Sequence, residues 1–238
     1  MVIWLASYPR SGNTFFRVLL HSLYGFETHA IYDVAKPGKQ PSEDARKLMT
    51  LIGQTELNCD VKLLSADRHP HFVKTHGLPE NDDFPAIVIV RDGRDAMVSY
   101  AYFVLKTERK IEQPDRGLVE STLQDLILED RFGGWSRNVE AWINRVGRDN
   151  IIRYEDLIEN PAEISIDALK RLDLSAAATV STPPSFQKLH ESVPWFFRKG
   201  HVGGWREEMP VHLQEMFFER HGHMLIELGY SAGRRVSL

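Results

Sequence analysis

Cysteine is nearly absent from this sequence, which has only Cys59 among its 238 residues. A single thiol can neither form a disulfide within the chain nor anchor a cysteine zinc cluster. Long apolar runs are missing as well: the run at 2–6 is far too short to cross a membrane and has no basic region before it. We therefore expect a cytoplasmic protein without a membrane span or a signal peptide.

The positive charge that is typical of nucleic-acid-binding proteins is also missing. The 29 basic and 33 acidic residues are interleaved along the chain and give a net charge of -4. No nucleic-acid partner is expected, and a polyanionic ligand would have to be bound by a local cluster of cations. With 42% hydrophobic residues and no repeat or linker, residues 1–238 are predicted to form a single domain.

Apolar runs and helical patterns alternate along the chain. Continuous apolar runs are typical of strands that are covered on both faces of a parallel sheet. The fold class we predict is a three-layer α/β/α domain with a central, mostly parallel sheet of about five strands. Strands are expected at 2–6, 72–74, 86–90 and 150–153; helices at about 16–24, 43–52, 91–102, 135–146, 162–172, 185–191 and 211–228; and loops at 28–41, 107–117 and 194–205.

The first strand leads directly into Tyr8-Pro9-Arg10-Ser11-Gly12-Asn13-Thr14, where a helix is expected to begin. Backbone N–H groups and the positive end of a helix can converge on an anion at such a turn. Arg10 adds a planar fork of donors, and Thr14 adds a hydroxyl. The segment is predicted to be a P-loop-like phosphate site, although the Walker pattern with its lysine is absent.

Two further segments combine cations with turn residues. Arg91 follows the strand at 86–90 and precedes a helix that carries Ser99. Arg198-Lys199-Gly200 places two cations beside a flexible glycine. Each segment alone is typical of a solvated basic turn, but two anion sites on one chain predict a ligand that is phosphorylated at both ends.

Lys74 and His76 lie two residues apart at the end of the strand at 72–74, so both side chains can project from one edge of the chain. Histidine is the side chain best suited to take a proton at neutral pH. His76 is therefore the candidate general base. Arg10 cannot act as a proton donor, because a guanidinium effectively never deprotonates, so its catalytic role is predicted to be electrostatic.

These motifs, in this order, resemble those of the PAPS-dependent sulfotransferases, where PAPS is 3′-phosphoadenosine 5′-phosphosulfate. The resemblance runs from Tyr8 to Trp205. The loop 8–14 is similar to the 5′-phosphosulfate loop, 91–100 to the 3′-phosphate segment, and 198–205 to the R-K-G-x-x-G-x-W signature. This chain departs from the family pattern at Arg10, where lysine is usual, and at Gly204, where aspartate is usual.

The resemblance implies the following site. The catalytic residues would be His76, Lys74 and Arg10, with no metal. The donor would be bound by Arg10, Ser11, Gly12, Asn13, Thr14, Phe15, Arg91, Ser99, Tyr154, Phe186, Arg198, Lys199 and Gly200. Arg91 and Ser99 would hold the 3′-phosphate, while Phe15, Tyr154 and Phe186 would pack on the adenine, although each aromatic taken alone is more typical of a core.

The implied reaction is transfer of a sulfuryl group from PAPS to a hydroxyl or amine of a small-molecule acceptor by in-line displacement. Two alternatives stay open: a non-catalytic binder of 3′-phosphoadenosine nucleotides, and a metal-dependent small-molecule kinase. The stretches at 28–67 and 103–131 are expected to shape the acceptor site. Arg206, Pro210, Val211 and Glu215 keep the spacing of the family's dimer motif with two residues changed, so a homodimer is one expectation for the assembly.

Overall fold

The computed structural model describes residues 1–31, 41–54, 59–174, 178 and 182–231. Its centre is a five-stranded sheet whose pairs are all parallel, in the order β2-β3-β1-β4-β5. The strands are β1 (Val2–Ser7), β2 (Thr28–Ala30), β3 (His71–Thr75), β4 (Ala86–Val90) and β5 (Ile151–Arg153). The predicted fold class is thereby confirmed.

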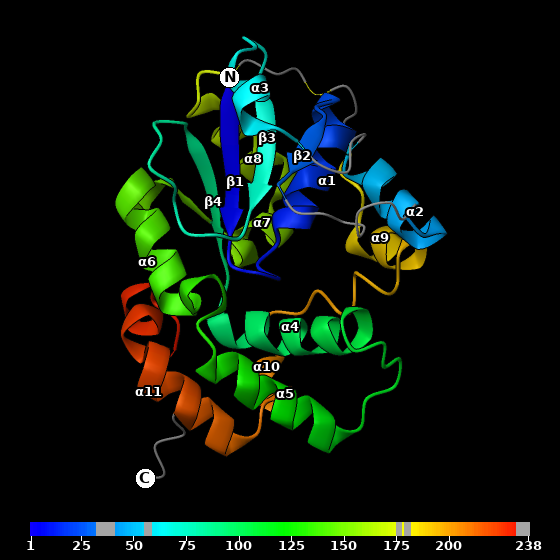
Figure 1. The fold of residues 1–238 in the computed structure, drawn as a ribbon, viewed down its shortest axis with the longest axis vertical. Helices are drawn as coiled ribbons and strands as arrows, with labels where there is room; N and C mark the ends of the chain where they lie inside the picture. Colours follow the sequence, from blue (N-terminus) through cyan, green and yellow to red (C-terminus); the bar gives the residue numbers. More distant parts are fainter. Residues whose placement is uncertain (32–40, 55–58, 175–177, 179–181, 232–238) are drawn as a thin grey trace.

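Helices cover both faces of the sheet (Figure 1). They are α1 (Asn13–Tyr24), α2 (Glu43–Leu51), α3 (Val61–Ser65), α4 (Gly93–Thr107), α5 (Arg116–Leu128), α6 (Trp135–Val146), α7 (Tyr154–Glu159), α8 (Pro161–Lys170), α9 (Phe186–Ser192), α10 (Trp205–Glu208) and α11 (Val211–Glu227). Short 3-10 helices occupy Arg131–Gly133 and Arg148–Asn150. Within the described ranges, none of the helices is both long enough and apolar enough to cross a membrane.

Strand β1 shows why the sheet is covered on both faces. Val2, Trp4 and Ala6 belong to the core that includes α4, α5, α6 and α11, whereas Ile3 and Leu5 belong to the core that includes α1 and α8. Because successive side chains of a strand point to opposite faces, a strand that separates two cores must be apolar at every position. The three-layer order follows directly from this run.

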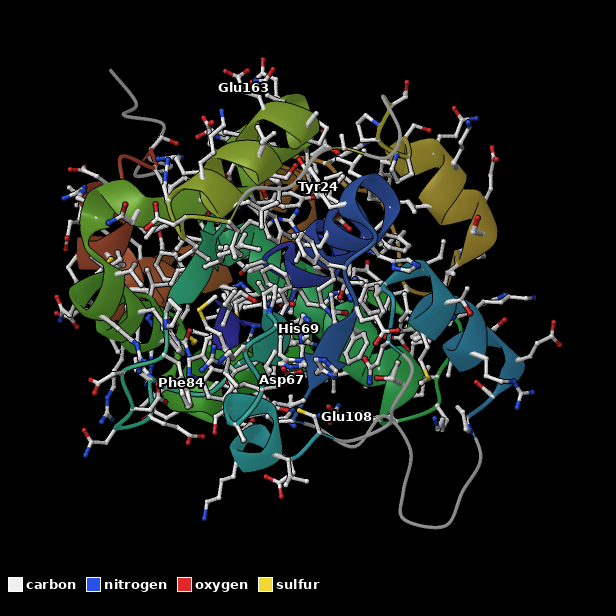
Figure 2. All side chains as sticks on the ribbon, turned by 90° about the horizontal axis from the view of Figure 1, so that it is seen from above. Tyr24, Asp67, His69, Phe84, Glu108 and Glu163 are labelled. Atoms are coloured by element: carbon white, nitrogen blue, oxygen red, sulfur yellow. The ribbon has the colours of Figure 1, made fainter. Side chains whose placement is uncertain are left out.

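The layer that contains α1 is fastened to α8 by a polar contact. Tyr24 lies near the end of α1 (Figure 2), and its hydroxyl is 3.0 Å from the Oγ of Ser165 in α8. Gly25 ends α1 in a left-handed conformation with φ 72, and its N–H donates to the carbonyl of His21 at 2.9 Å. The first strand–helix unit is therefore closed at a defined point.

Two parts of the fold differ from the prediction. The stretch 28–41 was expected to be a loop, but Thr28–Ala30 forms edge strand β2, paired with Phe72 to Lys74 of β3. Residues 32–40 of that stretch lie outside the described residues. Helices α3, α5, α7 and α10 were not predicted. Helices α3, α7 and α10 are too short for a periodic pattern, with five, six and four residues, and α5 begins within the stretch 107–117 that was expected to be a loop.

Candidate active site

One cavity of about 870 Å³ lies beyond the carboxyl ends of the strands, where α/β sheets usually bind ligands. It brings together nearly all the residues that were singled out from the sequence. The lining includes Arg10, Gly12, Asn13, Thr14, Phe15, Lys74, His76, Arg91, Ser99, Tyr154, Phe186, Arg198, Lys199 and Gly200. Ser11 does not line it: this residue is 1% exposed, and its hydroxyl has no hydrogen-bond partner among the described residues.

The turn between β1 and α1 depends on two residues with positive φ, Arg10 at 64 and Gly12 at 104. Gly12 is the N-cap of α1 and makes no side-chain capping bond. Asn13 instead donates from Nδ2 to the carbonyl of Leu5 at 2.8 Å. This bond holds the turn to β1, while Arg10 and the residues from Gly12 to Thr14 line the cavity.

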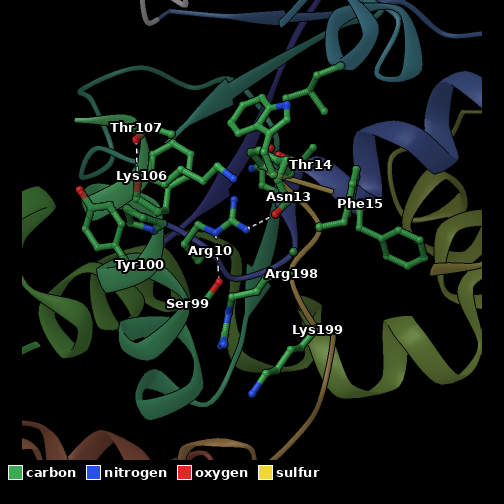
Figure 3. A pocket seen from close by; sticks show the side chains of 18 of the residues that line it. Arg10, Asn13, Thr14, Phe15, Ser99, Tyr100, Lys106, Thr107, Arg198 and Lys199 are labelled. Atoms are coloured by element: carbon green, nitrogen blue, oxygen red, sulfur yellow. Dashed lines mark hydrogen bonds between the residues drawn. The ribbon is translucent and has the colours of Figure 1, made fainter. Parts of the chain in front are cut away.

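The Arg10 side chain crosses the cavity toward α4 (Figure 3). Its Nε donates to Ser99 Oγ at 3.1 Å, and its Nη2 donates to the Phe196 carbonyl at 2.6 Å. The guanidinium also lies over the rings of Phe196 and Phe103, at 4.2 and 5.1 Å from the centroids. Burial, together with the charge of Arg91, lowers the pKa of Arg10 to about 9, so a bound anion would relieve an unfavourable charge.

Arg91 is hydrogen-bonded to the loop that carries Arg10. Its Nη1 donates to the Arg10 carbonyl at 3.1 Å and its Nη2 to the His201 carbonyl at 2.9 Å. Its guanidinium stacks over the Tyr154 ring at 4.3 Å, while its Nε has no partner among the described residues. Arg94, in contrast, forms an ion pair with Asp92 at 2.7 Å and is not among the residues that line the cavity.

The basic segment 198–204 is tied to two carboxylates. Arg198 Nη1 and Lys199 Nζ lie 2.5 and 3.2 Å from Glu208. Asp95 of α4 accepts hydrogen bonds from the N–H groups of Gly203 and Trp205 at 2.6 and 2.9 Å. The loop is therefore ordered by Asp95, even though glycine occupies position 204 in front of Trp205.

His76 and Lys74 project into the cavity from the end of β3. His76 Nδ1 lies 2.7 Å from the Ser7 carbonyl, and a carbonyl only accepts, so Nδ1 carries the proton and Nε2 of the neutral ring is basic. Burial, followed by the charge of Lys74, lowers the pKa of His76 well below its ordinary value. Burial and the charges of Arg17 and Arg10 lower the pKa of Lys74 to about 7.

Three aromatic residues line the cavity: Phe15 in α1, Tyr154 directly after β5 and Phe186 at the start of α9. A methyl group on Gly12 would lie 2.6 Å from Tyr154 Cδ2, and one on Gly200 would lie 2.6 Å from Phe186 Cε2. The two glycines therefore allow the loops to approach these rings. Rings close to backbone N–H groups suit a planar heterocycle that carries phosphates.

The structure adds cavity residues that the sequence did not single out, among them Arg17, Lys106, Arg131 and Glu208. Arg131 lies 3.4 Å from Glu108 and over the Tyr100 ring at 5.6 Å. Arg17 lies in the helix predicted at about 16–24, and only the apolar positions of that helix contribute to its predicted pattern. Nothing in the spacing of a single arginine indicates that its face of α1 turns toward a cavity.

Cation-rich loops at the strand ends, aromatic side chains and a histidine thus line one cavity. The family model that describes the sulfotransferase domain matches residues 2–225. The chain therefore belongs to the sulfotransferase family and is an enzyme of that class.

Relatives and solved structures agree with this membership. Mouse sulfotransferase 1 family member D1 is 28% identical over 91% of this chain and 81% of its own length. Human sulfotransferase 1E1 is 24% identical over 94% of this chain and 83% of its own. Mouse sulfotransferase SULT7A1, solved in complex with PAP, has the same fold, with a TM-score of 0.60, 16% identity and coverage of 95% and 88%. A retinol dehydratase solved with retinol and PAP superposes with a TM-score of 0.59, 18% identity and coverage of 97% and 82%.

Proposed function

We propose that this sulfotransferase takes its sulfuryl group from PAPS and passes it to a hydroxyl or amine of a small-molecule acceptor. One observation carries the proposal: Arg10 is hydrogen-bonded to Ser99 and in turn receives a bond from Arg91, so two cationic motifs share one cavity. A donor with phosphate groups at two positions matches two linked cationic sites. Two structural neighbours, SULT7A1 and a retinol dehydratase, were solved in complex with PAP, which supports the same donor.

The residues present fit this nucleotide. Arg91 and Arg198 each have a buried Nε without a partner among the described residues, so they have donors to give to a phosphate. Arg91, Ser99, Arg198, Lys199 and Gly200 would hold the 3′-phosphate. The loop Arg10 to Thr14 would hold the 5′-phosphosulfate, and Phe15, Tyr154 and Phe186 would pack on the adenine. No metal is included in this assignment.

The reaction is an in-line displacement at sulfur. His76 Nε2 takes the proton of the acceptor hydroxyl as its oxygen attacks, and the bond from sulfur to the bridging oxygen breaks. Negative charge then develops on the leaving phosphate, where the cations of Arg10 and Lys74 stabilise it. Positioning and neutralisation carry most of the catalysis, as they do in phosphoryl transfer.

The remaining parts of the proposal concern the acceptor, the domain, the cellular compartment and the assembly. The acceptor is a small molecule, and residues 1–238 act as one sulfotransferase domain in the cytoplasm. Retinol dehydratase, which has the same fold, was solved with retinol and with androsterone, and these ligands support a small acceptor. A homodimer through Arg206, Pro210, Val211 and Glu215 stays a prediction.

Two measurements test the proposal together. Calorimetry with PAP should detect binding, and incubation with labelled PAPS and a panel of phenols, alcohols, amines and hydroxy acids should label at least one product. PAP binding without transfer to any acceptor would favour the non-catalytic binder. Turnover that requires ATP and magnesium would favour the kinase. Absence of PAP binding would overturn the donor assignment.

A further inference from the structure

Arg17 is a buried cation that the proposed reaction does not use. It lies on the inner face of α1, one turn beyond the phosphate loop, and is only 2% exposed. Its Nε donates to Thr28 Oγ1 at 2.9 Å, and its Nη2 donates to Gln54 Oε1 at 2.6 Å. The residue nevertheless lines the same cavity as Arg10, Lys74 and His76.

Both hydrogen-bond partners of Arg17 are neutral. No carboxylate pairs with it in the part of the chain that the structure describes. Burial lowers the pKa of Arg17 to about 9, because a charge that is removed from water is unfavourable. Buried charges in proteins are normally paired, and a neutral side chain could fasten α1 to β2 without this penalty. The arrangement indicates that the counter-charge comes from a ligand.

The cavity wall around Arg17 belongs to the β2 edge of the sheet. Thr28 pairs with Phe72, and Ala30 pairs with Lys74, so Arg17 and Lys74 lie over the same sheet face. Arg91 follows β4, on the other side of β1. Arg17 is therefore separated from the residues assigned to the 3′-phosphate, and Lys74 and His76 lie between them in the order of the strands.

The neighbouring cavity residues on this side are mainly apolar. From β2 and from 42–54, the apolar lining residues are Ala30, Ala45, Leu48, Met49 and Ile52, and the polar ones are Ser42, Asp44 and Gln54. The guanidinium uses Nε and one Nη2 hydrogen for the protein, which leaves Nη1 and the second Nη2 hydrogen on one edge. Two parallel N–H groups match the two oxygens of a carboxylate or of another oxyanion.

We propose that Arg17, oriented by Thr28 and Gln54, binds an anionic group of the acceptor, so that the preferred acceptors are hydroxylated organic acids with an apolar body. The proposal rests on the proposed sulfotransfer. The acid would be held at Arg17 and the apolar body against Leu48 and Ile52, with the hydroxyl near His76. Arg17 thus acts as a specificity-determining residue for acceptors, while the donor is bound elsewhere.

The test compares hydroxy acids with their uncharged amides. Suitable pairs are 4-hydroxyphenylacetate with 4-hydroxyphenylacetamide and 10-hydroxydecanoate with its amide. For each pair, kcat/KM is measured with labelled PAPS, and binding is measured by calorimetry on the PAP-saturated and the nucleotide-free protein. We expect the wild type to prefer the acid by at least about tenfold in one or more pairs, as a charged hydrogen-bonded contact provides.

Variants at Arg17 identify the source of the preference. R17M should bring the acid-to-amide ratio to about one while PAP affinity stays within about twofold, and R17K should keep part of the preference because it keeps the charge. If R17M does not fold, the acid-to-amide ratios of R17K and of the wild type test the inference. A wild type without acid preference, an R17M protein that retains it, or R17M losing PAP affinity as strongly as acid selectivity would each overturn the inference.

Failure of the inference is distinguishable from failure of the proposed function. Transfer to amides and acids alike would leave the sulfotransferase assignment intact and remove only the role of Arg17. Arg17-dependent binding of acids by a protein that binds no PAP would leave the role of Arg17 intact and remove the donor assignment.

Discussion

Arg10 donates from Nε to the Oγ of Ser99 at 3.1 Å, although the two residues are 89 positions apart in the sequence. The contact joins the loop after β1 to the helix after β4, and Arg91 adds a second link through the Arg10 carbonyl at 3.1 Å. The anion-binding motifs of this chain are therefore one connected group of donors. A substitution in one motif is therefore expected to alter the other.

His76→Ala should reduce sulfuryl transfer by about 10²- to 10⁴-fold, the usual contribution of a positioned general base. PAP affinity should change by less than about threefold, because the predicted phosphate contacts come from other residues. Initial rates with labelled PAPS and calorimetry with PAP provide the two readouts.

The matched control for His76→Ala is His212→Ala. His212 is 57% exposed in its side chain and pairs with Glu120 outside the cavity, so its removal should leave the rate unchanged. Equal rates for His76→Ala and the wild type would remove His76 from the mechanism.

Gly12→Ala should weaken PAP binding and destabilise the fold. The added Cβ would lie 2.6 Å from Tyr154 Cδ2, and the backbone at φ 104 is unfavourable for an L side chain. Either the loop or the Tyr154 ring must move, at a cost of about 1–3 kcal/mol in unfolding free energy. Denaturant unfolding and PAP calorimetry measure the two effects.

Gly25→Ala separates backbone strain from the steric clash. Gly25 also has a positive φ, 72, but a methyl group there would meet nothing within 4 Å. This variant should lose only about 1 kcal/mol and bind PAP normally. Equal behaviour of the two alanine variants would show that the approach of Gly12 to Tyr154 is unimportant.

Lys74 predicts a specific dependence of stability on pH. Its pKa is lowered from 10.5 to about 7 in the folded protein by burial and by Arg17 and Arg10. Between these values the unfolded chain binds more protons at this residue than the folded chain, so the contribution of Lys74 to stability rises with pH. Below about pH 7 its full destabilising effect is present.

The comparison with Lys74→Met isolates this contribution. The unfolding free energy of the wild type minus that of the variant should increase from pH 7 to pH 10, since other titrating groups cancel in the difference. Urea unfolding at several pH values provides the measurement. A difference that stays flat or falls with pH would contradict the lowered pKa.

Glu208→Gln should strengthen PAP binding by about three- to tenfold. Glu208 lies 2.5 Å from Arg198 and 3.2 Å from Lys199, so its carboxylate competes with a phosphate for both cations. Burial alone would raise the pKa of Glu208, but its bonds to Arg198 and Lys199 lower the pKa below its usual range. The carboxylate is therefore ionised at neutral pH, and calorimetry should detect the gain when it is removed.

The opposing expectation for Glu208→Gln is a loss of affinity, which would mean that the carboxylate orders the loop. Asp95→Asn provides the comparison, because Asp95 binds the N–H groups of Gly203 and Trp205 and contacts neither Arg198 nor Lys199. That variant should weaken PAP binding by loosening the loop. Similar losses in both variants would reject the competition.

The sequence alone predicted the parallel α/β fold, because a strand with two covered faces is apolar at every position and is followed by helical periodicity. It also predicted the cavity-lining residues Arg10, Arg91, His76 and Arg198 from their places at strand ends and in loops. Strand β2 was missed because three residues beside a glycine- and proline-rich stretch have no periodicity to detect, and its pairing with β3 decides its structure.

Only the tertiary structure decided which of these groups meet. A pattern in sequence fixes the face of a helix or strand on which a residue lies, whereas the partner of a long side chain depends on elements that are distant in the chain. Arg10 with Ser99, Arg198 with Glu208, and Arg17 with Thr28 and Gln54 are all of this second kind. Local periodicity is set by neighbouring residues, but burial of charge is set by the whole fold, and for that reason the environment of Arg17 became visible only in three dimensions.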